Sequence, residues 1–205
     1  LLVSNINPEY TMGGMALKRK EILRRLAQEG IIDMNKQLQW AEVPQRIAVV
    51  SAEGAAGYGD FMNQLDNNPM GIMFYTKLFP AVMQGDKTVP SIIAAFDRIY
   101  ENIDLFDCVV VIRGGGATSE LHCFDSYELA ATIAQYPVPV IVGIGHERDV
   151  TVLDDVAAMR VKTPTAAAEW LISRGEAALA YIAELTNTMV TTARNYVSHA
   201  GEQLA

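Results

Sequence analysis

The chain has 205 residues, half of them hydrophobic, which is enough to bury the core of one compact domain with appended segments. Its formal net charge of −8 excludes a uniformly basic nucleic-acid-binding protein, although a local basic groove on an acidic background still suits a phosphate backbone. Cys108 and Cys123 form neither a metal-ligand spacing nor a disulfide framework, and no apolar run is long enough to span a bilayer, so we expect a soluble, cytoplasmic protein.

The first 45 residues are expected to lead into the main domain from a preceding one. Residues 1–7 read as a strand broken at Pro8, and residues 15–28 have apolar residues near helical spacing, with a stop at Gly30. Five of the 16 basic residues gather in this helix: Lys18, Arg19, Lys20, Arg24 and Arg25. They either guide a nucleic-acid strand or form an ordinary solvated face. Because the sequence opens without Met and stops inside a helical pattern, we expect a piece of a longer protein.

Residues 46–165 alternate between apolar runs rich in β-branched residues and helical stretches. The expected strands cover residues 46–51, 71–79, 107–115 and 138–145, and the expected helices cover residues 59–67, 88–102 and 119–136. Apolar strands separated by helices predict an α/β domain, with an open, mostly parallel sheet covered by helices on both faces. The pattern leaves the order of the strands open.

Residues 166–205 are good helix formers without an interrupting proline. A helix of this length has no room in the α/β domain. We therefore predict that it projects from the domain as a third region.

Three of the predicted strands run into loops that carry glycines and charged residues. Asp60 follows the first strand, Arg113 ends the third, and His146 and Asp149 follow the fourth; the glycines after Arg113 are Gly114, Gly115 and Gly116. Ligands of open α/β sheets bind beyond the carboxyl ends of the strands. Since the amides of a glycine loop at a helix N-terminus suit an anion, these loops predict a phosphate site.

Each of these residues also has a structural interpretation. Asp60 can cap a helix or complement its dipole, Arg113 can form an internal ion pair, and the glycines can form a simple turn. His122 is expected to pack within its helix. His146 is more specific, because Asp149 three residues later shares its face in a helix and stabilises the imidazolium that general acid–base catalysis needs.

Several other binding patterns are absent from the sequence. It has no G-x-x-x-x-G-K-[ST], no G-x-G-x-x-G spacing, no H-E-x-x-H and no G-x-S-x-G. A P-loop is therefore excluded, and we expect no dedicated zinc site.

The segments "PQRIAVVS", "GAAGYGD", "VVVIRGGGATSELHCFD", "PVPVIVGIGHERDVTVLDDVA" and "RVKTPTAAAEW", in this order, resemble the exodeoxyribonuclease VII large-subunit family. The match runs from residue 44 to about residue 170. The resemblance implies an enzyme that hydrolyses single-stranded DNA from either end and releases oligonucleotides. It also implies a partner, several copies of a small helical subunit, and no membrane association.

The same resemblance implies three regions and a set of site residues. Residues 1–45 would end the OB-fold region and form a basic linker helix, residues 46–165 the catalytic domain, and residues 166–205 the start of a coiled-coil arm that carries the small subunits. The active-site residues would be Asp60, Arg113, His146 and Asp149. The residues that bind phosphate or DNA would be Gly114, Gly115, Gly116, Lys18, Arg19 and Arg24.

We expect the chemistry to need no cofactor and no metal site, with a Mg²⁺ ion bridging Asp60 and the phosphate as the alternative. Two other functions remain open at this point. The chain could be a non-catalytic α/β module that binds a small phosphorylated ligand, or a scaffold for the small subunits.

Overall fold

The computed structural model describes residues 8–114, 118–145 and 150–203; for residues 8–13, 118–120, 200 and 203 it describes the backbone alone. The strands are β1 (Arg46–Ser51), β2 (Tyr75–Pro80), β3 (Cys108–Ile112), β4 (Val140–Gly143) and β5 (Met159–Arg160). The α-helices are α1 (Pro8–Gln28), α2 (Ala56–Asp66), α3 (Thr88–Tyr100), α4 (Tyr127–Ala134), α5 (Val152–Val156) and α6 (Pro164–Gln203). Short 3₁₀ helices are η1 (Asn35–Gln37), η2 (Ile103–Leu105) and η3 (Thr118–Phe124).

The five strands form one sheet in the order β2-β1-β3-β4-β5, and every pair is parallel. Val50 of β1 lies opposite Phe79 of β2 on one side and Val111 of β3 on the other. The predicted parallel α/β fold is therefore confirmed. Sequence analysis did not identify β5 and α5, since elements of two and five residues are too short to show a periodicity.

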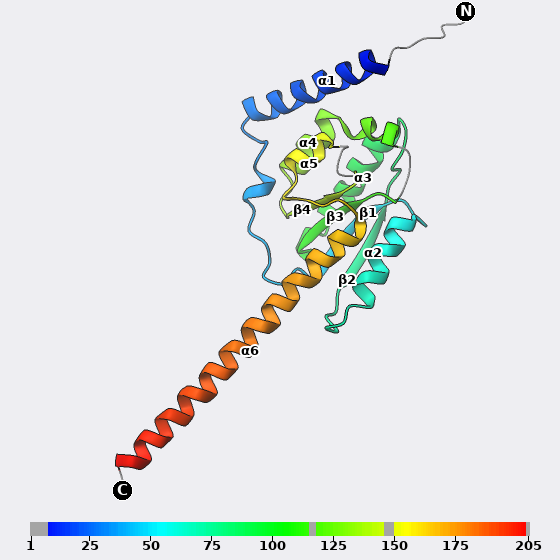
Figure 1. Ribbon diagram of the computed structural model, residues 1–205. Helices are drawn as coiled ribbons and strands as arrows, with labels where there is room; N and C mark the ends of the chain where they lie inside the picture. The colour runs from blue at the N-terminus through cyan, green and yellow to red at the C-terminus, as the bar shows by residue number, and fades with distance from the viewer. Residues whose placement is uncertain (1–7, 115–117, 146–149, 204–205) are drawn as a thin grey trace, which may run out of the picture.

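Helices cover both faces of the sheet, as expected for strands that are apolar throughout (Figure 1). Alternate residues of β1 enter different cores: Ala48 and Val50 pack with α3, α4 and α5, whereas Ile47 and Val49 pack with α2 and the first part of α6. Helix α1 lies against α4 and α5 and adds Ile22 to the first core.

The region predicted as one helix over residues 119–136 is two separate helices. The first, η3, ends at Phe124, and Ser126 caps the start of α4, where its hydroxyl accepts a hydrogen bond from the backbone N–H of Leu129. Serine is a preferred residue at this position because it satisfies a free amide of the first helical turn. His122 lies in η3 and is exposed, so the prediction that it packs internally is wrong; its neighbours Leu121 and Phe124 are the buried residues.

The second strand begins later than predicted, at Tyr75 and not at residue 71. Asn68 holds the chain in a turn before it: its amide donates to the carbonyls of Leu65 and Ile72 and its oxygen accepts from the Ile72 N–H. Asparagine side chains compete in this way with regular backbone pairing.

A buried asparagine ties the connection between α1 and β1 to the sheet. The side chain of Asn35 is fully buried, and its amide donates to the carbonyls of Tyr136 and Val138 at 3.1 and 3.0 Å. Its oxygen accepts from the backbone N–H groups of Val140 and Ala158, both at 2.9 Å. One side chain thus satisfies four backbone groups around the start of β4 and the approach to β5.

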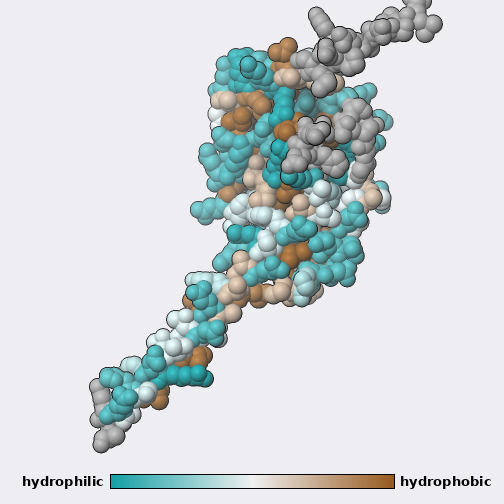
Figure 2. Space-filling model, viewed as in Figure 1, coloured by the Kyte–Doolittle hydropathy of each residue, from teal (hydrophilic) through white to brown (hydrophobic). Residues whose placement is uncertain are grey.

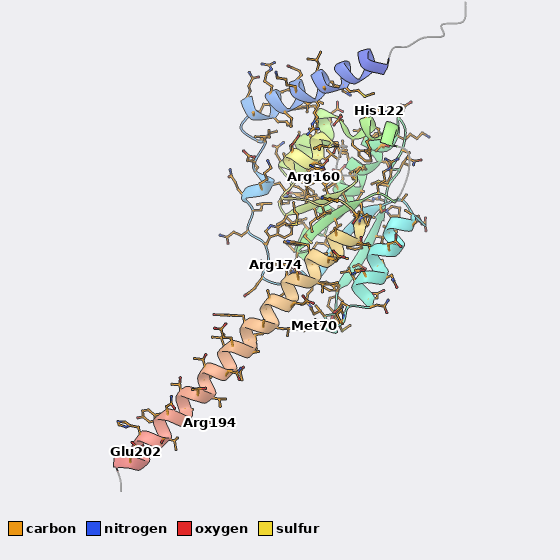
Figure 3. All side chains as sticks on the ribbon, viewed as in Figure 1. Met70, His122, Arg160, Arg174, Arg194 and Glu202 are labelled. Atoms are coloured by element: carbon orange, nitrogen blue, oxygen red, sulfur yellow. The ribbon has the colours of Figure 1, made fainter. Side chains whose placement is uncertain are left out.

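Helix α6 is buried only where it begins and then projects from the domain, as predicted (Figure 1). The rings of Trp40 and Trp170 pack edge to face with centroids 4.5 Å apart. Arg174, labelled in Figure 3 near the point where α6 leaves the domain, donates to the carbonyl of Ala41. The connection before β1 is therefore clamped to the base of the projecting helix. Among the described residues, no helix has both the length and the apolar character that crossing a bilayer requires.

Asp107 fastens the start of β3 to the start of β1. It accepts hydrogen bonds from the backbone N–H groups of Gln45 and Arg46 and pairs with the Arg46 guanidinium at 2.6 Å. Burial of the carboxyl opposes ionisation, but these donors outweigh it and hold the pKa of Asp107 below its usual range.

We expect Asp107→Asn to lower the melting temperature near neutral pH. A pKa that is lowered in the folded state stabilises the fold above the unfolded pKa, about 4 for an aspartate, and that contribution is lost as pH falls through the folded value. The difference in melting temperature between the two proteins should therefore shrink in acid. Thermal unfolding from about pH 7 to about pH 3 measures it. Asp66→Asn, at the exposed end of α2, controls for net charge. A difference that stays constant over this range would contradict the assignment.

Candidate active site at the carboxyl edge of the sheet

All five strands point the same way, so their carboxyl ends meet at one edge of the sheet. The connection after β1 leads to β2 on one side, and the connection after β3 leads to β4 on the other. The boundary between β1 and β3 is therefore the topological switch point, where open α/β sheets bind ligands. The predicted loops after the first and third strands flank this boundary.

A pocket of about 530 Å³ lies at this switch point. Residues 52, 55 and 56 line it from the connection after β1, residues 81–84 line it from the connection after β2, and Arg113 and Gly114 line it from β3. Sequence analysis named the first and third connections but not the second. The connection after β2 could have been recognised because it follows a predicted strand and contains Gly85.

Arg113 brings a cation into this pocket. Its side chain is buried, with 6% of the residue exposed, and its backbone N–H lies 3.4 Å from the Gly143 carbonyl of β4. Arg113 directly follows the last residue of β3, Ile112, so the buried strand and the bond to β4 fix where its side chain begins. A buried guanidinium beside a pocket suits a bound anion.

Gly114 is required by packing between two loops. A Cβ atom at Gly114 would lie 2.7 Å from the backbone nitrogen of Gly57, and one at Gly57 would lie 2.7 Å from the Gly114 Cα atom. Both contacts are with backbone, so neither can be relieved by a side-chain rotation. The two glycines allow the loop after β3 to touch the first turn of α2, and this contact closes one wall of the pocket.

The N-terminus of α2 is the second electropositive group at the pocket. The helix begins at Ala56, and Ala55 before it makes no capping hydrogen bond through its side chain. Residues 55 and 56 both line the pocket. The first amides of a helix are left without intrahelical partners and, with the helix dipole, favour an anion.

Asp60 is exposed and lies one turn inside α2, with no acidic residue in the first turn. The interpretation that Asp60 caps this helix is wrong, because the helix begins four residues earlier than Asp60. Asp60 follows Gly57 by three residues, so the two are neighbours on the surface of α2. Asp60 therefore lies about one helical turn from the contact between Gly57 and Gly114.

Four of the predicted site residues lie outside the described part of the chain: Gly115, Gly116, His146 and Asp149. Residues 150–152, directly after Asp149, accept hydrogen bonds from one guanidinium group and donate them to two carboxyl groups. Arg19 donates to the Val150 carbonyl at 2.6 Å, and Asp125 accepts from the Val152 N–H at 2.8 Å. Asp154 accepts from both the N–H and the hydroxyl of Thr151. The bond from the Thr151 N–H is one half of a capping box at the start of α5.

Burial raises the pKa of both carboxyls in this group, Asp125 and Asp154, and their hydrogen bonds to the residues around Thr151 act in the opposite direction. Residues 150–152 are therefore held by ionisable groups from α1, from the turn before α4 and from α5 itself.

The basic residues of α1 that were predicted to contact DNA differ in their surroundings. Arg19 is partly buried and forms an ion pair with Asp155 at 2.5 Å, in addition to its bond with Val150. Arg24 is exposed and pairs with Glu21 at 2.6 Å, and Lys18 is exposed. The guanidinium of Arg19 therefore holds α1 to α5, whereas Lys18 and Arg24 face solvent.

Among the described residues, no group of three or more His, Cys, Asp or Glu side chains is arranged to hold a metal ion. The sulfur of Cys108 is buried in the sheet, and burial raises the pKa of its thiol well above the usual range.

Comparison with known proteins matches the chain to one family. The family described as "Exonuclease VII, large subunit" matches residues 31–205. The exodeoxyribonuclease 7 large subunit of Cyanothece sp. is 40% identical over 157 residues, which cover 77% of this chain and 36% of that protein. The protein of the same name from Deinococcus radiodurans is 35% identical over 190 residues, covering 91% of this chain and 45% of its own length. The chain spans less than half the length of these relatives.

Proposed function

The chain belongs to the exonuclease VII large-subunit family, and from this premise we propose that it supplies the catalytic domain of an exodeoxyribonuclease. The reaction proposed is hydrolysis of phosphodiester bonds in single-stranded DNA, from either end, to give oligonucleotides.

One observation carries this proposal: the described residues place a buried guanidinium and an uncapped helix N-terminus on one pocket at the switch point. Both groups attract a phosphate, and they come from β3 and α2, which the Gly57–Gly114 contact holds together. Relatives named as exodeoxyribonuclease subunits support a nucleic-acid phosphate as the anion.

In the proposed mechanism, a water molecule attacks the scissile phosphorus and the P–O bond to the leaving sugar oxygen breaks. Arg113 and the amides of Gly114, Gly115 and Gly116 hold the phosphate and stabilise the charge that develops on its non-bridging oxygens. His146, oriented by Asp149, transfers a proton as general acid or base, and Asp60 positions or activates the water. This route needs no metal; in the alternative, Asp60 would help to hold a Mg²⁺ ion, which would offset charge on the phosphate.

The proposal is tested with labelled single-stranded DNA and the full-length large subunit assembled with its small subunit, with and without a chelator. We expect short oligonucleotides to be released in both conditions. Loss of activity with the chelator would favour the Mg²⁺ alternative. Binding without cleavage would favour a non-catalytic module. Unchanged cleavage by an Asp60/His146 double variant would favour the alternative in which this chain is a scaffold for the small subunits.

We also propose that the projecting part of α6 carries the small subunits. The helix is exposed beyond residue 178, yet it keeps large apolar side chains there, among them Ile182, Leu185, Met189 and Tyr196. Their spacing of three, four and seven residues places them along one side of the helix, which is the pattern of a coiled-coil surface. Figure 2 shows apolar patches on this helix, outside the α/β domain.

The exposed basic residues of α1 are proposed to guide the DNA strand. Each Lys or Arg that neutralises a phosphate adds roughly 0.7 to the slope of log affinity against log salt for a single strand. Reversing Lys18, Lys20 and Arg24 to glutamate should therefore flatten this slope by about 2 in binding titrations of the assembled enzyme. Lys36→Glu, Lys77→Glu and Arg194→Glu, at exposed positions outside α1, change the net charge by the same amount and control for it. An unchanged slope in the α1 variant would remove this helix from the DNA path.

A further inference from the structure

One wall of the pocket at the switch point has no role in binding a phosphate. Residues 81–84, "AVMQ", border it from the connection between β2 and α3, opposite Arg113 and Gly114. Ala81 and Met83 are buried, and Val82 is 43% exposed. A phosphate is bound by cations and N–H donors, so an apolar wall of this kind indicates a further, uncharged part of the ligand.

Two hydrogen bonds hold the start of this wall in place. The Ala81 N–H donates to the Ser51 carbonyl of β1 at 2.9 Å, and the Val82 N–H donates to the Ser91 hydroxyl of α3 at 2.8 Å. Gly85, which follows the wall, has a positive φ of 76°. A left-handed residue at this position turns the chain directly after Gln84 and leaves the Gln84 side chain at the pocket.

The three parts of the pocket match the three parts of a nucleotide. Arg113 and the α2 N-terminus suit the phosphate, and the apolar surface, to which the exposed Val82 contributes most, suits the face of a base. Gln84 carries both a donor and an acceptor, which suit the base edge or the sugar. A volume of about 530 Å³ lies within the range of sites that enclose small molecules, about 300–1,000 Å³.

We propose that this pocket is a nucleobase subsite that receives one unstacked base next to the scissile phosphate, and that this subsite is a source of the preference for single strands. The inference rests on the proposed nuclease function. A base in a duplex is stacked and paired, so unstacking and unpairing it before it enters the pocket costs free energy. In a single strand this cost is small. The wall is mainly apolar, so we expect it to accept any of the four bases.

The test compares a labelled single strand with the same strand carrying one abasic nucleotide, scanned along its length. With the assembled wild-type enzyme, cleavage at the bond beside the abasic position should be slower by about 10-fold, the effect of losing one base contact. Val82→Ala and Gln84→Ala should slow cleavage of the intact strand and reduce this discrimination to about 3-fold or less. Leu105→Ala, another exposed aliphatic residue but outside this pocket, should keep the full discrimination.

Equal cleavage beside a base and beside an abasic position by the wild-type enzyme would overturn the subsite. Undiminished discrimination in both wall variants would overturn it as well. If the assembled enzyme cleaves neither strand, the proposed function fails, and titrating both strands then tests the subsite separately: equal affinity for the intact and abasic strands would reject it.

Discussion

Arg113→Ala is expected to lower kcat of the assembled enzyme on single-stranded DNA by about 10²–10³-fold, the usual effect of removing one preorganised group that stabilises transition-state charge. Arg113 is buried at the end of β3 and lines the pocket at the switch point. Because negative charge on the phosphate oxygens increases during attack by water, the guanidinium contributes more to the transition state than to substrate binding. The fall should therefore appear mainly in kcat, with a smaller change in KM.

The conservative variant and a matched control make this result interpretable. Arg113→Lys keeps the charge but loses the planar fork of donors, and should recover only part of the lost rate. Arg174→Ala removes an arginine at the base of α6, where it contacts Ala41 and Trp170, and should leave kcat unchanged. Melting curves of all three variants show whether each one is folded. A folded Arg113→Ala enzyme with wild-type kcat would remove Arg113 from the proposed mechanism.

Asn35→Ala is expected to reduce the free energy of unfolding by about 3 kcal/mol, equivalent to a drop in melting temperature of roughly 6–12 °C. The reason is that Asn35 is fully buried and satisfies the carbonyls of Tyr136 and Val138 and the N–H groups of Val140 and Ala158. Its removal leaves four buried backbone groups without a protein partner from this side chain. Burying polar groups without hydrogen bonds is among the most destabilising changes a substitution makes.

Asn67→Ala is the matched control for this loss of stability. Asn67 is exposed, and its amide bonds only to Asn63 one turn earlier, so water replaces those bonds and the change should stay within about 0.5 kcal/mol. Thermal and denaturant unfolding of both variants measure the difference. An Asn35→Ala protein as stable as the Asn67→Ala protein would mean that water satisfies the four backbone groups equally well.

The regular elements could be predicted because their signals are local. The run at 46–51 is apolar throughout, and Ile92, Ala95, Phe96, Ile99 and Ile103 are predicted to form one helical stripe. The structure buries the first four of these residues, whereas Ile103 lies beyond α3 in η2 and is half-buried. Errors occurred where a single polar side chain interrupts the pattern. Ser126 divides a predicted helix in two, and Asn68 delays a strand, because each offers the backbone a local hydrogen-bond partner.

The candidate site could be predicted only in part. The loop glycines and Arg113 were visible as unusual residues after apolar strands, and parallel strands bring such ends to one edge. The partner of Arg19 was not visible, since Val150 lies 131 residues away along the chain. The wall formed by residues 81–84 was also missed, because apolar residues after a strand give no sign of the pocket that they line.

The sequence by itself therefore determined the class of fold, a parallel sheet covered on both faces with a long helix leaving it, and the residue types offered to a phosphate. Hydrophobic periodicity and turn residues act within one element, so they can be read from neighbouring positions. Only the tertiary structure decided the strand order, the contact between Gly57 and Gly114, and the pocket between three connections. These features depend on how whole elements pack against one another, and residues far apart in the chain meet only after that packing is complete.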